Sequence, residues 1–294
     1  MSRPSLRAAL TEGRFVAAPG IHDMIAAVVA NKVGFDFIYS SGYWGTASAY
    51  GLPDAGIVSY SDMLERLSIL ARTSKASVIA DADTGYGGLL NVDHTVRGFE
   101  AAGAIAIQIE DQEFPKKCGH TPNKRVIPAD EMVTKLKVAC AARENPSETL
   151  IIARTDARQM EGFERAIERG LAYRDAGADV VFVEALMSEE EMRTACERID
   201  APMMANMSDG GQTPIKSAAE LEAIGYQMAI YPSATGLAAA AAVENALRTI
   251  ASQGTSKSPD VPLFDFGEFN QLIGFQDVWD FEAAWVDKQN GGGA

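Results

Sequence analysis

One recurring unit constrains the fold of this chain more than any other sequence feature. Four times an amphipathic stretch ends near a glycine, and a short apolar run follows that closes on polar residues; the glycines are Gly34, Gly103, Gly177 and Gly225. Glycine suits the left-handed position just past a helix, and an unbroken apolar run suits a strand buried on both faces. The unit therefore predicts helices that alternate with parallel strands.

The same signals extend along most of the chain. Strands are expected at residues 15–18, 35–41, 78–81, 104–111, 150–155, 178–184, 202–206 and 226–232. Helices are expected at residues 24–33, 60–72, 92–102, 129–143, 163–176, 188–199, 217–224 and 236–253. The count approaches eight βα units, in a length close to the ~250 residues typical of a TIM barrel. The sequence thus predicts an α/β fold, a (β/α)8 TIM barrel over residues 1–253.

The remaining residues, 254–294, form a tail with a different composition. Residues 254–262 are polar and predict a linker, whereas residues 263–288 carry many aromatic side chains and predict a helical segment. So many exposed aromatics need a partner surface. We expect this segment to pack on another subunit or against the base of the barrel, and the Gly-Gly-Gly-Ala end to be disordered.

Charge and composition exclude several functional classes. The formal net charge is -14, and such a surface repels phosphate backbones and anionic lipids, so no nucleic-acid or membrane partner is expected. No run of 18 or more apolar residues predicts a membrane span, and the N-terminus has no secretory h-region. The three cysteines have no CxxC spacing, which favours reduced thiols in the cytoplasm.

Polar side chains gather where the predicted strands end, and in a TIM barrel these ends build the active site. Polar residues can simply terminate strands, but packing gains nothing from a carboxylate or arginine at most of the ends. The functional interpretation is therefore favoured. The strand-end residues are Gly20, His22, Ser41, Gly42, Tyr43, Asp81, Asp83, Glu110, Asp111, Arg154, Asp156, Glu184, Asn206 and Ser233.

The Asp81-Ala-Asp83 pair predicts a metal site. Two carboxylates two residues apart at a strand end point the same way, and the glycines that follow let the backbone approach a ligand. Hard oxygen ligands of this kind suit Mg²⁺. Glu110 and Asp111 end the next strand and are candidates to complete the shell, as is Asp54 on the preceding loop.

A second candidate feature is the loop after the fourth predicted strand. Cys118 is flanked there by Lys116, Lys117 and His120, an electropositive setting that favours the reactive thiolate. Its glycine gives the loop the freedom to close over the barrel mouth. The alternative is a solvated basic loop with an incidental cysteine. Arg154, at the end of strand five, either grips a substrate carboxylate or pairs with Asp156 or Glu184, and both can hold.

At these residues the sequence resembles the isocitrate lyase/phosphoenolpyruvate mutase superfamily. The resemblance rests on Lys116-Lys-Cys-Gly-His120, which is similar to the KKCGH signature of the lyase branch, and on further motifs in matching order from about residue 10 to residue 285. These further motifs lie at residues 51–54, 80–88, 109–112, 153–157 and 206–214.

The resemblance implies a barrel whose last helix is swapped between subunits, in a homotetramer built as a dimer of helix-swapped dimers. It also implies a Mg²⁺ ion, with Mn²⁺ as a possible substitute, held by Asp81, Asp83 and Glu110 and through water by Asp54. Cys118 would then be the acid/base on the loop, and Tyr39 or Tyr43 the base that takes a hydroxyl proton. The implied substrate contacts are Ser41, Gly42, Tyr43, Asp81, Gly119, His120, Arg154 and Asn206, and the residues that orient the chemistry are Lys117, His120 and Glu184.

The implied activity is the cleavage of a carbon–carbon bond in a small 2-hydroxy dicarboxylic acid. Tyr43, Gly210 and Gly211 resemble the group that contains dimethylmalate lyase and oxaloacetate hydrolase, whereas Cys-Gly-His-x-Pro-Asn-Lys124 resembles methylisocitrate lyases. The stretch from Ser233 lacks the arginine with which the latter grip an extra carboxylate. We therefore expect a lyase for a 2,3-dimethylmalate-type substrate. A 2-methylisocitrate lyase, an oxaloacetate hydrolase and a barrel that only binds dicarboxylates remain the alternatives.

Overall fold

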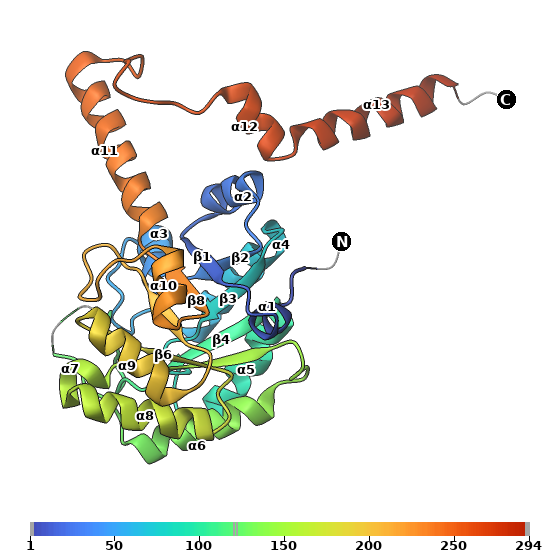
Figure 1. The fold of residues 1–294 in the computed structure, drawn as a ribbon. Helices are drawn as coiled ribbons and strands as arrows, with labels where there is room; N and C mark the ends of the chain where they lie inside the picture. Colours follow the sequence, from blue (N-terminus) through green and yellow to red (C-terminus); the bar gives the residue numbers. More distant parts are fainter. Residues whose placement is uncertain (1–2, 120, 122, 292–294) are drawn as a thin grey trace.

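Eight parallel strands form the core of the molecule. The computed structural model describes residues 3–119, 121 and 123–291. The sheet has the order β6-β5-β4-β3-β2-β1-β8-β7, and a bridge between Val181 and Met203 brings β6 beside β7, so the sheet curves into a nearly closed barrel (Figure 1). The strands are β1 (Val16–Ile21), β2 (Phe37–Ser40), β3 (Ser77–Asp81), β4 (Ala104–Glu110), β5 (Leu150–Thr155), β6 (Val180–Val183), β7 (Met204–Asn206) and β8 (Met228–Tyr231). The predicted TIM barrel is confirmed.

Helices surround this barrel, and all eight expected ones are present; the last of them begins at the barrel and then projects away from it (Figure 1). They are α2 (Met24–Val33), α4 (Tyr60–Thr73), α5 (Leu89–Ala102), α6 (Ala129–Ala142), α8 (Phe163–Asp175), α9 (Glu189–Ile199), α10 (Ala218–Ile224) and α11 (Ala234–Gln253). Gly34 and Gly103 end α2 and α5 with φ of 91° and 104°, so each occupies the left-handed position that the sequence predicted.

Three helices were not predicted: α1 (Leu6–Thr11), α3 (Gly42–Tyr50) and α7 (Ala157–Glu161). Of these, α3 matters most because it begins directly after β2. Ser41 is its N-cap, and the Ser41 hydroxyl accepts a hydrogen bond from the Trp44 N–H at 3.4 Å. Residues 41–43 therefore form a helix N-terminus rather than a strand end. The N–H groups of such a terminus have no partner within the helix, and the Gly42 N–H donates instead to Asp81 Oδ2 at 3.1 Å.

The barrel interior is filled by side chains rather than open. Its buried residues come from most of the strands and include Ile79, Ala106, Ile152, Phe182 and Met228. Two further apolar clusters lie between the strands and the surrounding helices. Because this packing is dense on both faces of the sheet, the strand ends are held rigidly, and the side chains that project from them have fixed positions.

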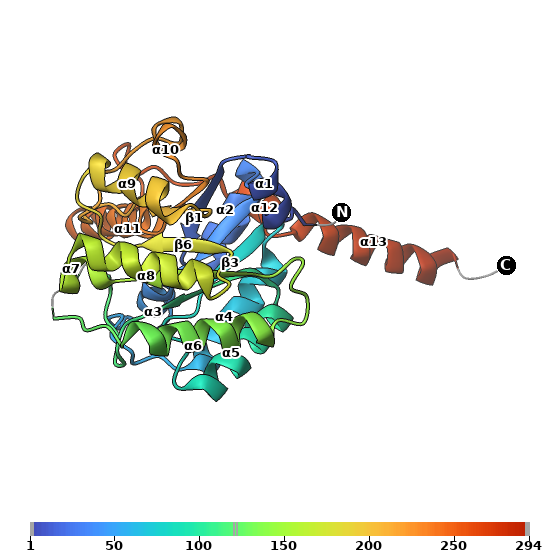
Figure 2. The same ribbon diagram turned by 60° about the horizontal axis from the view of Figure 1, so that its bottom comes forward.

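The C-terminal tail consists of α12 (Phe266–Leu272) and α13 (Phe275–Gly291). The expected single helical segment is broken at Gly274, whose φ of 92° is left-handed. Lys32 of α2 pairs with Glu268 of α12 at 3.0 Å, while α13 extends away from the barrel (Figure 2). Packing of α13 against the barrel base is thus not observed, and packing on another subunit stays a prediction. Gly291, expected to be disordered, belongs to α13; residues 292–294 lie outside the described residues.

No helix in the described part of the chain is long and apolar enough to cross a membrane.

Candidate active site

A cavity of about 280 Å³ opens at the C-terminal ends of the strands. Most of the predicted site residues line it: Tyr39, Ser41, Tyr43, Asp54, Asp81, Glu110, Lys117, Cys118, Gly119, Arg154, Glu184 and Asn206. Gly42 and Asp83 lie just behind this wall, since a Cβ on Gly42 would meet Asp83 Oδ1 at 2.9 Å. His120 falls outside the described residues. The fold thus brings these residues from six strand ends and two loops to a single cavity.

A buried lysine pairs with two of the predicted metal ligands. Lys116 Nζ lies 2.6 Å from Asp54 Oδ1 and 2.5 Å from Asp83 Oδ1, and the Lys116 side chain is only 4% exposed. Burial raises the pKa of Asp83 to about 7, with the charges of Asp81 and Asp54 adding to the shift and Lys116 opposing it. Sequence reasoning had singled out Lys117. It could not tell which of two adjacent lysines points inward.

Asp81 is oriented by several donors at the base of the cavity. The Gly42 N–H donates to Asp81 Oδ2 at 3.1 Å, and Gln108 Nε2 donates to Asp81 Oδ1 at 3.2 Å. Gln108 also accepts the Tyr39 hydroxyl at 3.1 Å. Burial, and then the charge of Asp81, raise the pKa of Tyr39 well above its ordinary value. Gln108 was missed in the sequence, although a glutamine inside the apolar run of β4 is the signal of a buried polar contact.

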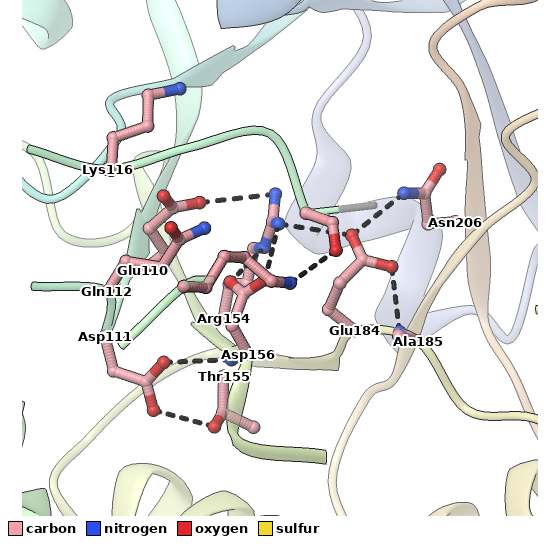
Figure 3. Close-up of polar contacts among 12 residues, drawn as sticks. Glu110, Asp111, Gln112, Lys116, Arg154, Thr155, Asp156, Glu184, Ala185 and Asn206 are labelled. Atoms are coloured by element: carbon pink, nitrogen blue, oxygen red, sulfur yellow. Dashed lines mark hydrogen bonds and ion pairs between the residues drawn. The ribbon is translucent and has the colours of Figure 1, made fainter. Parts of the chain in front are cut away.

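Arg154 is the cation around which the remaining carboxylates gather (Figure 3). Its guanidinium lies 2.9 Å from Asp156, 3.3 Å from Glu110 and 3.3 Å from Glu184. Asn206 Nδ2 donates to Glu184 Oε2 at 3.0 Å and so fixes the outer carboxylate. The expected ion pair of Arg154 with Asp156 or Glu184 is confirmed, and the structure shows it with both carboxylates.

Asp156 is the most strongly ionised member of this group. Burial opposes its ionisation, but the charges of Arg154 and of Lys124 outweigh burial and lower the pKa of Asp156 to about 2. Glu110 shows the opposite behaviour, since burial raises its pKa well above the ordinary value despite the nearby Arg154. The mouth thus holds carboxylates whose environments push their pKa values in opposite directions, which is common at functional sites.

The loop that carries Cys118 lies directly over this arrangement. A Cβ added to Gly119 would meet Arg154 Nη2 at 2.2 Å and Glu184 Oε2 at 3.0 Å, so only glycine allows the loop backbone to approach so closely. Cys118, the preceding residue, lines the cavity. The Lys117 ammonium donates to the Asn123 carbonyl at 3.2 Å within the loop. The predicted loop over the barrel mouth is therefore present, in a closed position.

The carboxylates fit a Mg²⁺ ion that keeps part of its water shell. Glu110 Oε1 is buried and has no hydrogen-bond partner within the described structure, and Asp54 and Asp83 have their charge balanced by Lys116. No three His, Cys, Asp or Glu side chains of the described residues already surround one point where a metal would sit. Mg²⁺ prefers oxygen ligands, takes few of them directly from the protein and keeps several waters, so these carboxylates suit that ion.

Active sites of TIM-barrel enzymes lie at this face of the barrel, and the fold and the cavity together place the chain in that class. The family model described as phosphoenolpyruvate phosphomutase matches residues 6–251. The chain belongs to the phosphoenolpyruvate mutase/isocitrate lyase superfamily.

Two relatives are similar over nearly the whole chain. The 2,3-dimethylmalate lyase of Eubacterium barkeri is 42% identical over 277 residues, which cover 94% of this chain and 96% of the relative. A 2-methylisocitrate lyase of Aeropyrum pernix is 43% identical over 279 residues, covering 94% and 89%. The two relatives act on different substrates, so identity of this order does not select one.

Two solved structures share the fold. Oxaloacetate acetylhydrolase in complex with 3,3-difluorooxalacetate has a TM-score of 0.88 and 33% identity, covering 99% of this chain and 97% of its own. Phosphonopyruvate hydrolase in complex with oxalate and Mg²⁺ has a TM-score of 0.85 and 31% identity, covering 96% and 98%. The same barrel therefore supports lyases and hydrolases, and the reaction must be argued from the site.

Replacement of Asp156 by asparagine tests the charge balance of the mouth. We expect Asp156→Asn to lower the free energy of unfolding by about 3 kcal/mol near neutral pH, because Arg154 and Lys124 lose a shared buried partner. The depressed pKa gives the wild type its full advantage above the ordinary carboxyl pKa of about 4, and this advantage is lost as pH falls toward 2. Urea unfolding of both proteins at a series of pH values measures this difference in the free energy of unfolding.

The matched control is Glu168→Gln, which breaks an exposed pair with Arg165. That change should shift stability by less than about 0.5 kcal/mol at any pH. Equal effects of the two variants, or an Asp156 effect that grows in acid, would contradict the assignment.

Proposed function

We propose that this protein is a Mg²⁺-dependent carbon–carbon lyase. It cleaves a small 2-hydroxy dicarboxylate of the 2,3-dimethylmalate or 2-alkylmalate type into a 2-oxo acid such as pyruvate and a carboxylic acid. One observation carries the proposal: Cys118, on a closed loop, shares a cavity with a carboxylate cluster and with Arg154. A proton donor thus faces a site built to hold an oxyanion and a carboxylate.

The 2-hydroxy acid end of the substrate is proposed to bind at the start of α3. The N-terminus of a helix favours an anionic group, because its N–H groups point outward and its dipole is positive there. Ser41 supplies a hydroxyl, Tyr43 supplies a backbone N–H, and Arg154 supplies a guanidinium on the other side. The Gly42 N–H, which donates to Asp81, would be shared between that carboxylate and the substrate. The other carboxylate then extends toward Gly119, Asn206 and the loop. His120, a further proposed substrate contact, lies outside the described residues.

The reaction begins when a base takes the proton of the C2 hydroxyl. The C2–C3 bond then breaks, C2 becomes the carbonyl of the 2-oxo acid, and the electron pair moves to C3 and spreads into its carboxylate. The thiol of Cys118 gives its proton to C3, and the resulting thiolate is reprotonated before the next turnover. Lys117 and Glu184 orient the cysteine end, while the closed loop excludes water that would otherwise protonate the carbanion.

Tyr39 and Tyr43 are the two proposed bases. Tyr39 is favoured by position, since its hydroxyl lies beside Asp81 and Gln108 at the base of the cavity. Asp81, Asp83 and Glu110, with Asp54 through water, would hold Mg²⁺. Bound Mg²⁺ would supply positive charge that stabilises the oxygen at C2.

The β7–β8 side of the cavity favours a substrate without a third carboxylate. Leu237, Trp44, Asp209 and Gly210 line that part of the wall. The cationic side chains among the described lining residues are those of Arg154 and of two loop lysines. An additional carboxylate, as in 2-methylisocitrate, would meet the apolar Leu237 and the acidic Asp209. This supports a dicarboxylate over a tricarboxylate.

Product analysis by NMR in the presence of Mg²⁺ tests the proposal. The panel is 2,3-dimethylmalate, citramalate, isocitrate, 2-methylisocitrate and oxaloacetate. We expect pyruvate and propionate from 2,3-dimethylmalate, with Cys118→Ala reducing kcat by at least ~100-fold because the carbanion then lacks its proton donor. Cys196→Ala, a control in α9 outside the cavity, should keep full activity.

The panel also separates the alternatives. Succinate and pyruvate from 2-methylisocitrate would make the protein a 2-methylisocitrate lyase. Oxalate and acetate from oxaloacetate alone would make it a hydrolase like the structural neighbour. Turnover that survives in Cys118→Ala would remove the cysteine from the acid role, and no turnover of any compound would favour a binding protein.

The metal proposal predicts a pH-dependent affinity for Mg²⁺. Because the pKa of Asp83 is raised to about 7, metal binding must displace a proton in more acidic solution, and the Kd should rise as pH falls from about 8 to about 6. Calorimetry in two buffers of different ionisation enthalpy measures both the Kd and the proton release. Asp83→Asn should abolish binding, while Asp93→Asn, on the exposed face of α5, should not. A pH-independent Kd would refute the assignment.

We further propose that the tail joins subunits in the cytoplasm, where the three cysteine thiols would stay reduced. The helices α12 and α13 expose large apolar side chains; Phe266 is 78% exposed and Phe281 is 65% exposed. The outer face of α11 exposes Leu247 and Ile250 as well. Apolar surface of this extent on one chain needs a partner. A second copy that exchanges its tail would cover it, in a dimer of helix-swapped dimers.

Removal of residues 263–294 should therefore split the tetramer, as measured by size-exclusion chromatography with light scattering. Lys32→Ala removes only the cation that pairs with Glu268, so it is the control that should leave the oligomer intact. A shortened chain that remains tetrameric would argue against the exchange.

A further inference from the structure

A buried lysine outside the proposed chemistry lies beneath the Cys118 loop. Lys124 Nζ is 2.7 Å from Asp156 Oδ1, and both side chains are fully buried. Nothing in the proposed reaction uses this ammonium. Burying a charged pair is costly unless the geometry is good and further hydrogen bonds are made, so the position of Lys124 calls for a reason.

The second contact of Lys124 supplies that reason. Its ammonium also donates to the Gly119 carbonyl, which belongs to the residue next to Cys118. One side chain thus connects the turn that carries the thiol to a carboxylate at the end of β5. Residues 118 and 124 belong to the same loop, so the link holds the loop both to itself and to the barrel.

The carboxylate that receives Lys124 is itself held in place. The Asp156 N–H donates to Asp111 Oδ1 at 2.9 Å, and Asp111 accepts the Tyr173 hydroxyl at 2.7 Å. Asp156 also pairs with Arg154 at 2.9 Å, so the loop and the substrate-binding arginine share one carboxylate (Figure 3). A displacement of the loop would have to break a contact within this network.

Further hydrogen bonds of the loop lie at its entry, at its base and within the turn itself. At its entry, the buried Gln112 side chain accepts the Lys117 N–H at 3.0 Å and donates to the Lys117 carbonyl at 2.8 Å. At its base, the Glu113 N–H donates to the Arg125 carbonyl at 2.8 Å. Neither contact reaches Gly119. The Thr121 hydroxyl donates to the Cys118 carbonyl at 2.7 Å, which closes the turn on itself, whereas Lys124 joins the Gly119 carbonyl to the barrel.

We propose that Lys124 is a positioning residue that holds the Cys118 turn closed over the barrel mouth by joining the Gly119 carbonyl to Asp156. The inference rests on the proposed role of Cys118 as proton donor. Loss of this link releases the turn, which exposes the thiol and moves it away from C3. Misplacement of a catalytic group by ~1 Å can cost ~100-fold in rate, so the effect falls on kcat rather than on Mg²⁺ binding.

Two variants and one control test this. Lys124→Met keeps the length of the side chain but removes the charge and the donor, whereas Lys124→Gln keeps a donor for the Gly119 carbonyl. Arg125→Met is the matched control, since Arg125 is the next residue and makes an exposed pair with Glu113. Each protein is compared for kcat, for KM and for the rate at which iodoacetamide alkylates Cys118, followed by peptide mass spectrometry, with thermal unfolding as the check of folding.

For Lys124→Met we expect alkylation of Cys118 to accelerate about tenfold and kcat to fall at least tenfold. The melting transition should stay cooperative but move to a lower temperature, because the buried Asp156 loses one of its two cationic partners. Lys124→Gln should have a kcat and an alkylation rate between those of Lys124→Met and the wild type. If the methionine variant does not fold, the glutamine variant provides the test. Arg125→Met should match the wild type. Unchanged alkylation in a folded Lys124 variant overturns the proposal, whether or not kcat falls.

Alkylation needs no substrate, so the two proposals can fail separately. Faster alkylation in a protein that turns over none of the panel would leave the role of Lys124 standing and reject the proposed lyase. A Lys124 variant with a wild-type alkylation rate, in a protein that is an active lyase, would reject the role of Lys124 and support the proposed function.

Discussion

The surplus of buried negative charge at the barrel mouth is the constraint on which this site depends. Asp81, Asp83, Glu110, Asp156 and Glu184 are all at most 8% exposed and project into one region. Buried carboxylates repel one another and lose their hydration, so they must either bind protons or be paired with cations. The structure uses both means: the pKa values of Asp83 and Glu110 are raised, and three cationic side chains enter the cluster.

The three cations come from two places. Arg154 belongs to the barrel itself, at the end of β5, whereas Lys116 and Lys124 both belong to the loop between β4 and α6. The loop therefore contributes to the charge balance of the barrel as well as covering it. A loop that moved away would carry two ammonium groups out of the cluster and leave their carboxylates unpaired. Electrostatics alone thus favours the closed position of Cys118 in the absence of other cations.

The sequence predicted the architecture well because the fold repeats one simple unit. Each expected strand overlaps an observed strand, since a strand buried on both faces has an unmistakable apolar run. The helix α3 was missed because Gly42-Tyr-Trp-Gly45 carries neither helical periodicity nor strong helix formers. Its start depends on the Ser41 cap and on the Asp81 carboxylate that accepts the Gly42 N–H, and the latter is a contact between distant parts of the chain.

The site was predictable as a set of residues but not as a network. The position of the carboxylates at the C-terminal ends of predicted strands places them at the barrel mouth. The cation that pairs with each carboxylate depends on the direction of side chains on a loop, which the sequence pattern does not predict. The sequence accordingly selected Lys117, assigned Lys116 only to the electropositive surroundings of Cys118, and left Gln108 and Lys124 without a role.

The distribution of charge has a consequence for the proposed reaction. Among the residues that line the cavity, Arg154 lies at the end of β5, and Lys116 and Lys117 lie on the loop that covers the mouth. Asp209 and Leu237 follow β7 and β8 on the other side. A dicarboxylate is therefore attracted toward one side of the cavity and excluded from the other, which restricts its orientation before any bond breaks. Under the proposed function, the carbon that must receive a proton is then held near the cysteine by the same field that binds the substrate.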